Sequence, residues 1–332
     1  MARSRTRNEA LLVADIGGTN ARFGVWYEGA LHGEQVYRCS GYPGPAEAAG
    51  AYLKQFRATS ALPMPRSAAF AIAGPLLEDR VVMTNNSWDF SAAATRHALG
   101  LDRLIFLNDF TALALAVPQL AVSERFQVGG AAPLADGAIA VIGPGTGLGV
   151  SGLLRTGSHW LALQGEGGHA TLPVVDAREM AVVSALHRSY AHVSAERVLS
   201  GDGLELLYRT LAGLDGVAVA PLSAGEITER ALAGTDKGCV ETVDLFCGWL
   251  GNVAGNLALT LGARGGVYIG GGIVPRFGGH FATSPFRQRF EAKGRYAGFL
   301  ATLPVFVITA KYPALIGCVQ AFEHASPRLE AG

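Results

Sequence analysis

The sequence Leu11-Leu-Val-Ala-Asp-Ile-Gly-Gly-Thr-Asn-Ala-Arg-Phe23 joins two apolar runs through a turn that contains two glycines. This order of apolar run, glycine turn and apolar run predicts a β-hairpin. Glycines let backbone N–H groups approach a ligand closely, and Thr19 and Asn20 add side-chain donors, so the turn carries groups that bind phosphate. Asp15, at the end of the first run, is a candidate for holding Mg²⁺ or its water shell. An ordinary hairpin turn has the same pattern, and this stretch alone does not separate the two.

A second strand, glycine turn and strand is predicted further along the chain. Ala138–Ile142 is apolar, Gly143-Pro-Gly-Thr-Gly-Leu-Gly149 follows, and Val150–Leu154 is apolar again. The turn does not match the G-x-G-x-x-G dinucleotide motif, and no glycine in the chain is followed by lysine, as a P-loop requires. A glycine turn around Thr146 can still wrap a phosphate, although a flexible interdomain turn has a similar composition. The recurrence of the pattern indicates the two halves of a duplicated fold.

Length and composition limit the class of protein. With 332 residues, the chain exceeds the size at which one hydrophobic core stops growing, so two domains are expected. The net charge is +0 and the only basic run is the short segment Arg3–Arg7, which argues against nucleic acid as a main partner. The four cysteines show no C-x-x-C spacing, which argues against a disulfide scaffold or a thiolate zinc site and fits a reducing cytosol. The N-terminal residues are polar and lack the apolar core of a signal peptide.

One uncharged segment, Leu245–Ala263, needs a separate interpretation. It contains Gly251-x-x-x-Gly255, a spacing found where membrane helices pair. Its large apolar residues follow one helical stripe, however, and do not surround the helix. We therefore predict a buried helix whose glycines allow close packing, and no membrane span.

The predicted elements alternate in the first part of the chain. After the hairpin we expect strands at Val36–Cys39, Ala68–Ala73, Arg80–Thr84 and Leu104–Leu107, with helices at Ala46–Arg57, from Ser91 to Gly100, and after Asp109. The order is typical of a three-layer α/β domain with a mixed sheet. The second part is more helical, with capping boxes predicted at Asp176 and Asp202. It also contains a long helix over ~237–262, strands at Val267–Ile269 and Val305–Ile308, and a closing helix from Leu315 to about His324.

Asn108-Asp109 stands where a buried strand gives way to a helix. Ligands of α/β sheets bind beyond the carboxyl ends of the strands. A carboxylate at that place can accept a proton from a substrate hydroxyl. The alternative is that Asp109 only caps the helix that follows.

Three other sites carry polar groups or glycines. Glu166 and His169 lie in Gln164-Gly-Glu-Gly-Gly-His169, a loop too rich in glycine for a helix. Two ligands without a third make a weak metal site, and the same groups suit a polyol. Glu196 is either another such group or a solvated helix residue. The glycines of Gly270–Gly272 either let a flat base or ribose approach or allow tight packing.

Taken together, the sequence resembles the bacterial glucokinases outside the repressor/ORF/kinase family, which belong to the actin/hexokinase superfamily. The resemblance extends over roughly residues 10 to 325. The blocks that carry it are Asp15-Ile-Gly-Gly-Thr-Asn-Ala-Arg22, Met83-Thr-Asn85, Asn108-Asp-Phe-Thr-Ala112, Gly145-Thr-Gly-Leu-Gly149, Gly165-Glu-Gly-Gly-His169, His192-Val-Ser-Ala-Glu-Arg-Val-Leu-Ser-Gly201 and Gly270-Gly-Gly-Ile-Val-Pro-Arg276.

The resemblance implies roles for individual residues. Asp109 would be the catalytic base that accepts the proton of the sugar 6-hydroxyl. The sugar ligands would be Asn85, Asn108, Asp109, Glu166, His169 and Glu196. The ATP-binding residues would be Ala14, Asp15, Ile16, Gly17, Gly18, Thr19, Asn20, Gly145, Thr146 and Gly271. Mg²⁺ would enter with ATP, with Asp15 as its candidate protein ligand, and no other metal is expected.

The resemblance also implies a ribonuclease H-like, actin-like ATPase fold with duplicated mixed-sheet halves. Residues 1–118 with 311–332 would form a small domain and residues 119–310 a large one, with sugar and ATP in the cleft between them. The expected activity is phosphorylation of D-glucose by ATP to glucose 6-phosphate, the first step of glycolysis, in a cytoplasmic homodimer. Two departures from the family pattern are Ala14, where relatives often have glycine, and Pro144, which removes one N–H from the second turn.

Two alternatives use the same scaffold. One is a kinase for another hexose, such as mannose, fructose or an amino sugar. The other is a sugar-sensing regulator, which would need a module for binding DNA or a partner. We expect no such module, because the segment before Leu11 leaves no room for a helix-turn-helix.

Overall fold

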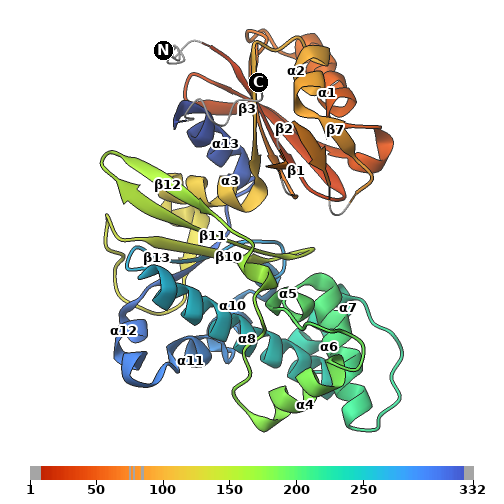
Figure 1. Ribbon diagram of the computed structural model, residues 1–332, viewed down its shortest axis with the longest axis vertical. Coiled ribbons are helices and arrows are strands. Elements are labelled where there is room, and N and C mark those ends of the chain that lie inside the picture. The colour runs from red at the N-terminus through yellow and green to blue at the C-terminus, as the bar shows by residue number, and fades with distance from the viewer. Residues whose placement is uncertain (1–8, 75, 78, 84–85, 325–332) are drawn as a thin grey trace. The chain divides into compact units, whose positions relative to one another are not determined.

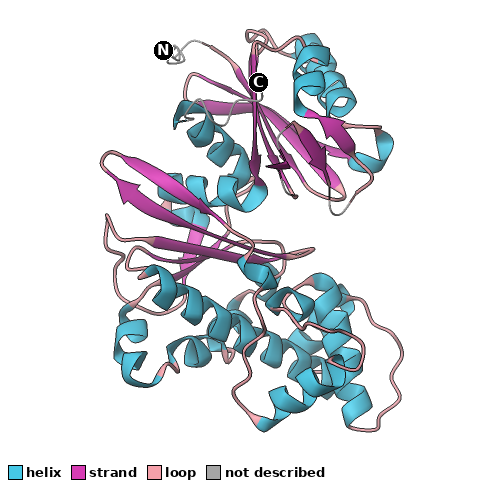
Figure 2. Cartoon of the chain, viewed as in Figure 1, coloured by secondary structure: helices cyan, strands magenta, loops and turns pink. Residues whose placement is uncertain are grey.

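The computed structural model describes residues 9–74, 76–77, 79–83 and 86–324. The chain divides into two compact units. Figure 1 colours the chain from its N-terminus to its C-terminus, and Figure 2 colours its helices and strands. Unit 1 contains the residues up to Leu120 and those from Ala310 onward, and unit 2 contains Ala121–Thr309. Each unit is built on a mixed β-sheet accompanied by helices, which confirms the predicted α/β fold class.

The sheet of unit 1 has five strands in the order β3-β2-β1-β4-β8. The strands are β1 (Leu11–Ile16), β2 (Asn20–Tyr27), β3 (Ala30–Arg38), β4 (Ser67–Ile72) and β8 (Arg103–Asn108), and a separate small sheet contains β5 (Leu76–Leu77), β6 (Arg80–Val82) and β7 (Asp89–Ser91). β1 and β2 form the predicted antiparallel hairpin, whereas β1, β4 and β8 run parallel. Ile16, Ile72 and Asn108 are therefore aligned at one edge of the sheet, where the three parallel strands end.

Both faces of this sheet are buried, as the continuous apolar run of β1 requires. Leu12 and Ala14 belong to a core that also contains Tyr52 of α1 (Pro45–Thr59) and Ala92 of α2 (Ala92–Ala98). Leu11, on the other face, packs in the core of α3 (Asp109–Ala116) and α13 (Pro313–His324). Short 3₁₀ turns, η1 (Cys39–Gly41) and η2 (Val117–Gln119), complete the elements of this unit.

The contact between α13 and α3 is unusually close. A Cβ atom added to Gly317 in α13 would lie 1.7 Å from the carbonyl oxygen of Ala112 in α3. Only a residue without a side chain allows the two helices to approach so closely. The C-terminal helix is thus fitted to a helix that precedes unit 2 in the sequence.

The sheet of unit 2 has six strands in the order β12-β11-β10-β13-β14-β9. These are β9 (Arg125–Gln127), β10 (Ile139–Pro144), β11 (Leu148–Thr156), β12 (His159–Gln164), β13 (Gly266–Ile269) and β14 (Val305–Ile308). β10 and β11 are antiparallel, and β10, β13 and β14 are parallel. The core arrangement of unit 1, a hairpin joined to parallel strands, is therefore repeated, as the duplicated pattern predicted.

The long helix α8 (Lys237–Leu261) is central to the core of unit 2. Its Gly251 and Gly255 face α11 (Phe286–Glu291), where added Cβ atoms would lie 2.2 Å and 2.7 Å from backbone oxygens. This confirms the prediction that the two glycines allow close packing. The remaining helices are α4 (Ala177–Leu186), α5 (Ala195–Val198), α6 (Gly201–Leu214), α7 (Ala224–Ala233), α9 (Val274–Phe277), α10 (Gly279–Thr283) and α12 (Ala297–Thr302), with 3₁₀ turns η3 (Val122–Glu124), η4 (Gly167–His169) and η5 (Gly294–Tyr296).

The two predicted capping boxes were wrong in detail. Asp176 caps α4, but the Glu179 carboxylate accepts a bond from Val175 N–H and not from the cap residue. The helix predicted to begin at Asp202 begins at Gly201, because the hydroxyl of Ser200 accepts the bond from Gly203 N–H. None of the helices in the described ranges combines the length and apolarity that a membrane span needs.

Candidate active site

The turn between β1 and β2 is fixed mainly through its carbonyl groups. Gly17 N–H donates to the carbonyl of Asn20 at 3.0 Å, and Cys39 N–H donates to the carbonyl of Thr19 at 2.9 Å. The carbonyl of Gly17 accepts bonds from the Cys39 thiol and from the Asn86 amide, each at 3.4 Å. The Thr19 side chain is exposed. The turn therefore has a defined shape with its threonine open to solvent, as a phosphate site needs.

Asp15 is paired at the base of this turn. Its Oδ2 atom accepts a 3.0 Å hydrogen bond from Arg22 Nη1, and its side chain is 18% exposed. Burial raises the pKa of Asp15, and the Arg22 guanidinium acts in the opposite direction. A carboxylate oxygen at this place is a donor of the kind Mg²⁺ prefers, so the residue fits the predicted role. Ala14 and Ile16, predicted near ATP, are fully buried strand residues, and only their backbone is available for such a role.

Asn108 and Asp109 occupy the carboxyl end of β8 and the start of α3. The Asn108 side chain, not that of Asp109, is the helix cap, since its Oδ1 accepts from the N–H groups of Phe110 and Thr111 at 2.9 Å and 3.1 Å. Asp109 Oδ1 also accepts from Phe110 N–H at 2.8 Å. Both side chains are half-buried. Capping thus belongs chiefly to Asn108, and this weakens the alternative that Asp109 serves only as a cap.

Unit 1 brings two of the predicted groups to one edge of its sheet. The glycine turn follows Ile16, and Asp109 follows Asn108, and these two strand ends are aligned through β4. Asn85, the third predicted sugar ligand from this unit, lies outside the described residues.

The second predicted turn is shorter than the sequence suggested. β10 and β11 extend into the glycine run, so that Pro144 pairs with Leu148 and only residues 145–147 form the turn. Gly145 N–H donates to the carbonyl of Gly147 at 2.8 Å and closes it. Thr146 is exposed at the tip. We call residues 144–148 the phosphate turn below.

Glu166 and His169 lie in the segment 165–169, which we call the sugar loop. Its final residues form a 3₁₀ turn, contrary to the expectation that the glycines would prevent helical structure. His169 N–H donates to the carbonyl of Glu166 at 3.0 Å, and both side chains are exposed. A Cβ on Gly168 would lie 2.0 Å from the carbonyl oxygen of Leu148, so the sugar loop is packed directly onto the phosphate turn.

Glu196, on the short helix α5, also reaches the phosphate turn. Its Oε2 accepts a bond of 2.8 Å from Leu148 N–H, and its Oε1 lies 3.7 Å from Nδ1 of His169. Sequence reasoning missed the first contact, since nothing local to the sequence pairs two residues 48 positions apart. The structure therefore joins three predicted groups, Glu196, His169 and the phosphate turn.

Gly271 completes this cluster of loops. It has a φ of +78°, and a Cβ there would lie 2.2 Å from the carbonyl oxygen of Pro144. The tight packing that the sequence left as one alternative is therefore present. The residue is nonetheless exposed, so its other side remains open.

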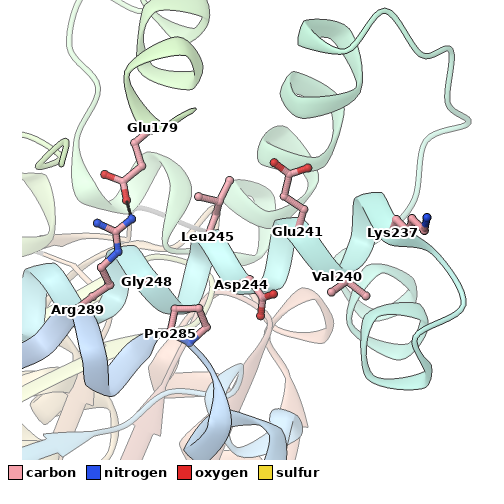
Figure 3. Close-up of a pocket in the computed structure, with 9 residues that line it drawn as sticks. All are labelled: Glu179, Lys237, Val240, Glu241, Asp244, Leu245, Gly248, Pro285 and Arg289. Atoms are coloured by element: carbon pink, nitrogen blue, oxygen red, sulfur yellow. Dashed lines mark ion pairs between the residues drawn. The ribbon is translucent and has the colours of Figure 1, made fainter. Parts of the chain in front are cut away.

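A pocket elsewhere in unit 2 contains none of the predicted residues. Its volume is 390 Å³, and its lining includes Glu179, Glu241, Asp244, Lys237 and Arg289 (Figure 3). Glu179 is fully buried and lies 3.0 Å from Arg289 Nη2, and burial raises its pKa. Glu241 is paired with Arg178 at 2.7 Å, and Oδ1 of Asp244 lies 3.7 Å from Nε2 of His280, so each carboxylate of the lining has a basic neighbour. Among the described residues, no cluster of three or more His, Cys, Asp or Glu side chains has metal-binding geometry.

Comparison with known proteins identifies the class of this fold. The structure of a glucokinase from an Antarctic psychrotroph superposes with a TM-score of 0.84 at 34% identity, covering 96% of this chain and 99% of that one. A Balamuthia mandrillaris glucokinase, solved in complex with glucose, shares the fold at a TM-score of 0.79 and 18% identity, covering 96% of this chain and 94% of that one. The fold is that of the sugar kinases of the actin-like ATPase superfamily.

The sequence comparisons are more specific. The family model Glucokinase matches residues 12–325. A glucokinase of Neisseria meningitidis (serogroup B, strain MC58) is 51% identical over 314 residues, 94% of each chain. The chain belongs to the glucokinase family, which confirms the resemblance seen in its sequence blocks.

Proposed function

We propose that this protein transfers the γ-phosphoryl group of ATP to the 6-hydroxyl of D-glucose and so supplies the first step of glycolysis. The observation that carries the proposal is membership of the glucokinase family over nearly the whole chain. Phosphoryl transfer needs positioning and charge stabilisation more than covalent chemistry by the protein. Two glycine turns and one carboxylate at a strand end are groups suited to that task.

In the proposed reaction Asp109 is the general base. Its side chain is half-buried at the start of α3, and Asn108 carries the capping bonds to Phe110 and Thr111. An ionised carboxylate can accept the proton as the 6-hydroxyl attacks the γ-phosphorus. Asn85, Asn108, Glu166, His169 and Glu196 would bind the other hydroxyl groups.

ATP would be held by the two glycine turns. Asp15–Asn20 and residues 145–146 would bind its phosphates, and Gly271 would lie toward the adenosine. Asp15 would hold Mg²⁺ directly or through water, with Arg22 keeping one of its oxygens in place. When bound, Mg²⁺ neutralises phosphate charge.

We also propose that the protein is a cytoplasmic homodimer, because it resembles the family. Light scattering on a sizing column would measure its oligomeric state.

The decisive experiment is an ADP-release assay coupled to glucose and run across a panel of hexoses. We expect ADP in proportion to glucose, with higher kcat/KM for glucose than for mannose, fructose or glucosamine. A preference for another hexose would support the alternative kinase, and sugar binding without ADP release would support a sensing role.

A further inference from the structure

The phosphate turn is the structural centre of the candidate residues in unit 2. Its Gly145 carbonyl accepts a bond of 2.9 Å from Gly201 N–H, at the start of α6. Gly168 of the sugar loop and Gly271 each come so close that a Cβ would lie 2.0 Å and 2.2 Å from turn oxygens. A turn packed on several sides has few alternative conformations, so a movement of one neighbour changes its shape.

Glu196 differs from the other neighbours of the phosphate turn because each of its two carboxylate oxygens faces a different candidate group. Oε2 accepts the bond from Leu148 N–H, and Oε1 faces His169 of the sugar loop. The carboxylate is anchored, since Ser194 caps α5 through a bond from Arg197 N–H and the side chain is only 33% exposed. A single carboxylate therefore lies between the sugar loop and the phosphate turn.

We infer that Glu196, besides binding the sugar, positions the phosphate turn and so couples sugar binding to ATP binding within unit 2. The inference rests on the proposed function and extends it. A sugar hydroxyl that binds Oε1 and His169 fixes the orientation of the carboxylate. The same event holds Oε2 on Leu148 N–H, and so orders the phosphate turn before the nucleotide arrives. Binding of the second ligand then costs less conformational entropy.

Gly147 supplies an independent way to disturb this link. A Cβ on Gly147 would lie 2.4 Å from Oε2 of Glu196, and the residue is not among those with positive φ. Alanine can therefore adopt the backbone conformation but must displace the carboxylate. Gly147→Ala keeps the Glu196 carboxylate and Leu148 N–H but pushes them apart. Glu196→Asp shortens the side chain, so that its carboxylate cannot reach Leu148 N–H and His169 together.

The experiment measures coupling directly. The Kd of the magnesium complex of AMPPNP is determined by calorimetry without glucose and with glucose at a concentration that saturates each variant. Because coupling between two ligands is reciprocal and is typically 5- to 150-fold, we expect glucose to tighten AMPPNP binding by about that factor in the wild type. The coupling ratio is the Kd of AMPPNP without glucose divided by the Kd with glucose. In Glu196→Asp and Gly147→Ala this ratio should fall below about twofold.

Glu166→Gln is the matched control, since it changes an exposed carboxylate that is also proposed to bind glucose but lies in the sugar loop. It should weaken glucose binding and keep the wild-type ratio. The inference is overturned if Glu196→Asp and Gly147→Ala, with unchanged melting temperatures, keep the wild-type ratio, or if Glu166→Gln loses it equally. Wild-type protein that binds both ligands without coupling overturns the inference alone. Wild-type protein that binds neither ligand overturns the proposed function as well.

Discussion

Asp15 and Arg22 are directly opposite each other in the β1–β2 hairpin, and a hydrogen bond of 3.0 Å joins their side chains. Arg22 is held in turn against the ring of Tyr312, whose centroid lies 5.6 Å from the guanidinium carbon. Burial raises the pKa of Asp15, and the neighbouring cation limits that rise. Arg22 therefore helps to keep the candidate magnesium ligand ionised.

Replacing Arg22 by methionine should change how kcat/KM for ATP depends on pH, so that the loss of activity in acid begins at a higher pH. Without the cation the pKa of Asp15 rises further, and a protonated carboxyl no longer binds Mg²⁺ or its water shell. Because the Arg22 guanidinium lowers the pKa of Asp15, we expect the acid limb of the Arg22→Met profile to lie at higher pH than that of the wild type. Profiles of kcat/KM for ATP against pH would measure it. Arg22→Lys retains the charge and should lie near the wild type, and coincident profiles for all three proteins would refute the role.

Replacing the proposed base, Asp109, by asparagine should preserve folding and glucose affinity but abolish most turnover. Asparagine keeps the shape and can bond the sugar, yet it cannot accept the proton of the attacking hydroxyl. Loss of general base catalysis costs roughly 10²- to 10⁴-fold in kcat. Steady-state kinetics and calorimetry would separate the two effects. Asp102→Asn, which removes an exposed ion pair with Arg66 in the same unit, is the control and should leave kcat unchanged. An Asp109→Asn enzyme with more than about a tenth of wild-type kcat would exclude Asp109 as the base.

Thr146 at the tip of the phosphate turn should contribute to ATP binding through its hydroxyl. Thr146→Val removes the hydroxyl with little change of volume. A hydrogen bond to a charged group contributes about 1.5–3 kcal/mol, so the KM for ATP should rise about 10- to 100-fold while glucose binding survives. Thr156→Val, at the exposed end of β11, is the matched control and should change neither constant. Unaltered ATP kinetics in Thr146→Val would remove this residue from the site.

The contact of α13 with α3 should make Gly317 sensitive to the smallest side chain. Gly317→Ala places a Cβ 1.7 Å from a backbone oxygen, so one helix must move. Overpacking of this kind costs about 1–3 kcal/mol, which urea unfolding would report. Gly213→Ala, in α6 with nothing within 4 Å of the new Cβ, should instead stabilise the protein by about 0.5–1 kcal/mol. Equal midpoints for the two variants would contradict the interpretation.

The sequence was most informative where a local pattern determines structure. The hairpin of β1 and β2, the repeated hairpin of β10 and β11, and the long helix α8 all follow from apolar periodicity and glycine placement. The position of Asp109 beyond β8 was predicted in the same way, because the apolar run of a buried strand ends where polar residues begin. Patterns of this kind act within a few residues, which is why they could be recognised.

What the sequence could not show depends on contacts between distant segments. The bond from Leu148 N–H to Glu196 joins residues with no common pattern. The choice of Ser200 over Asp202 as the cap of α6 depends on where Gly203 packs, since a Cβ there would lie 2.4 Å from the carbonyl of Val198. Tertiary packing determines both the bond between Leu148 and Glu196 and the choice of cap residue, and local propensity predicts neither.

The connection of α13 to the sheet of unit 1 has a consequence for the order in which the protein is made. Leu11 and Val13 precede unit 2 in the chain, whereas α13, which packs with α3 on their face of the sheet, follows the whole of unit 2. Unit 2 is one continuous segment and can close its core while synthesis continues. Unit 1 begins first and is completed last, so its half-covered sheet is the surface that chaperones would meet during translation.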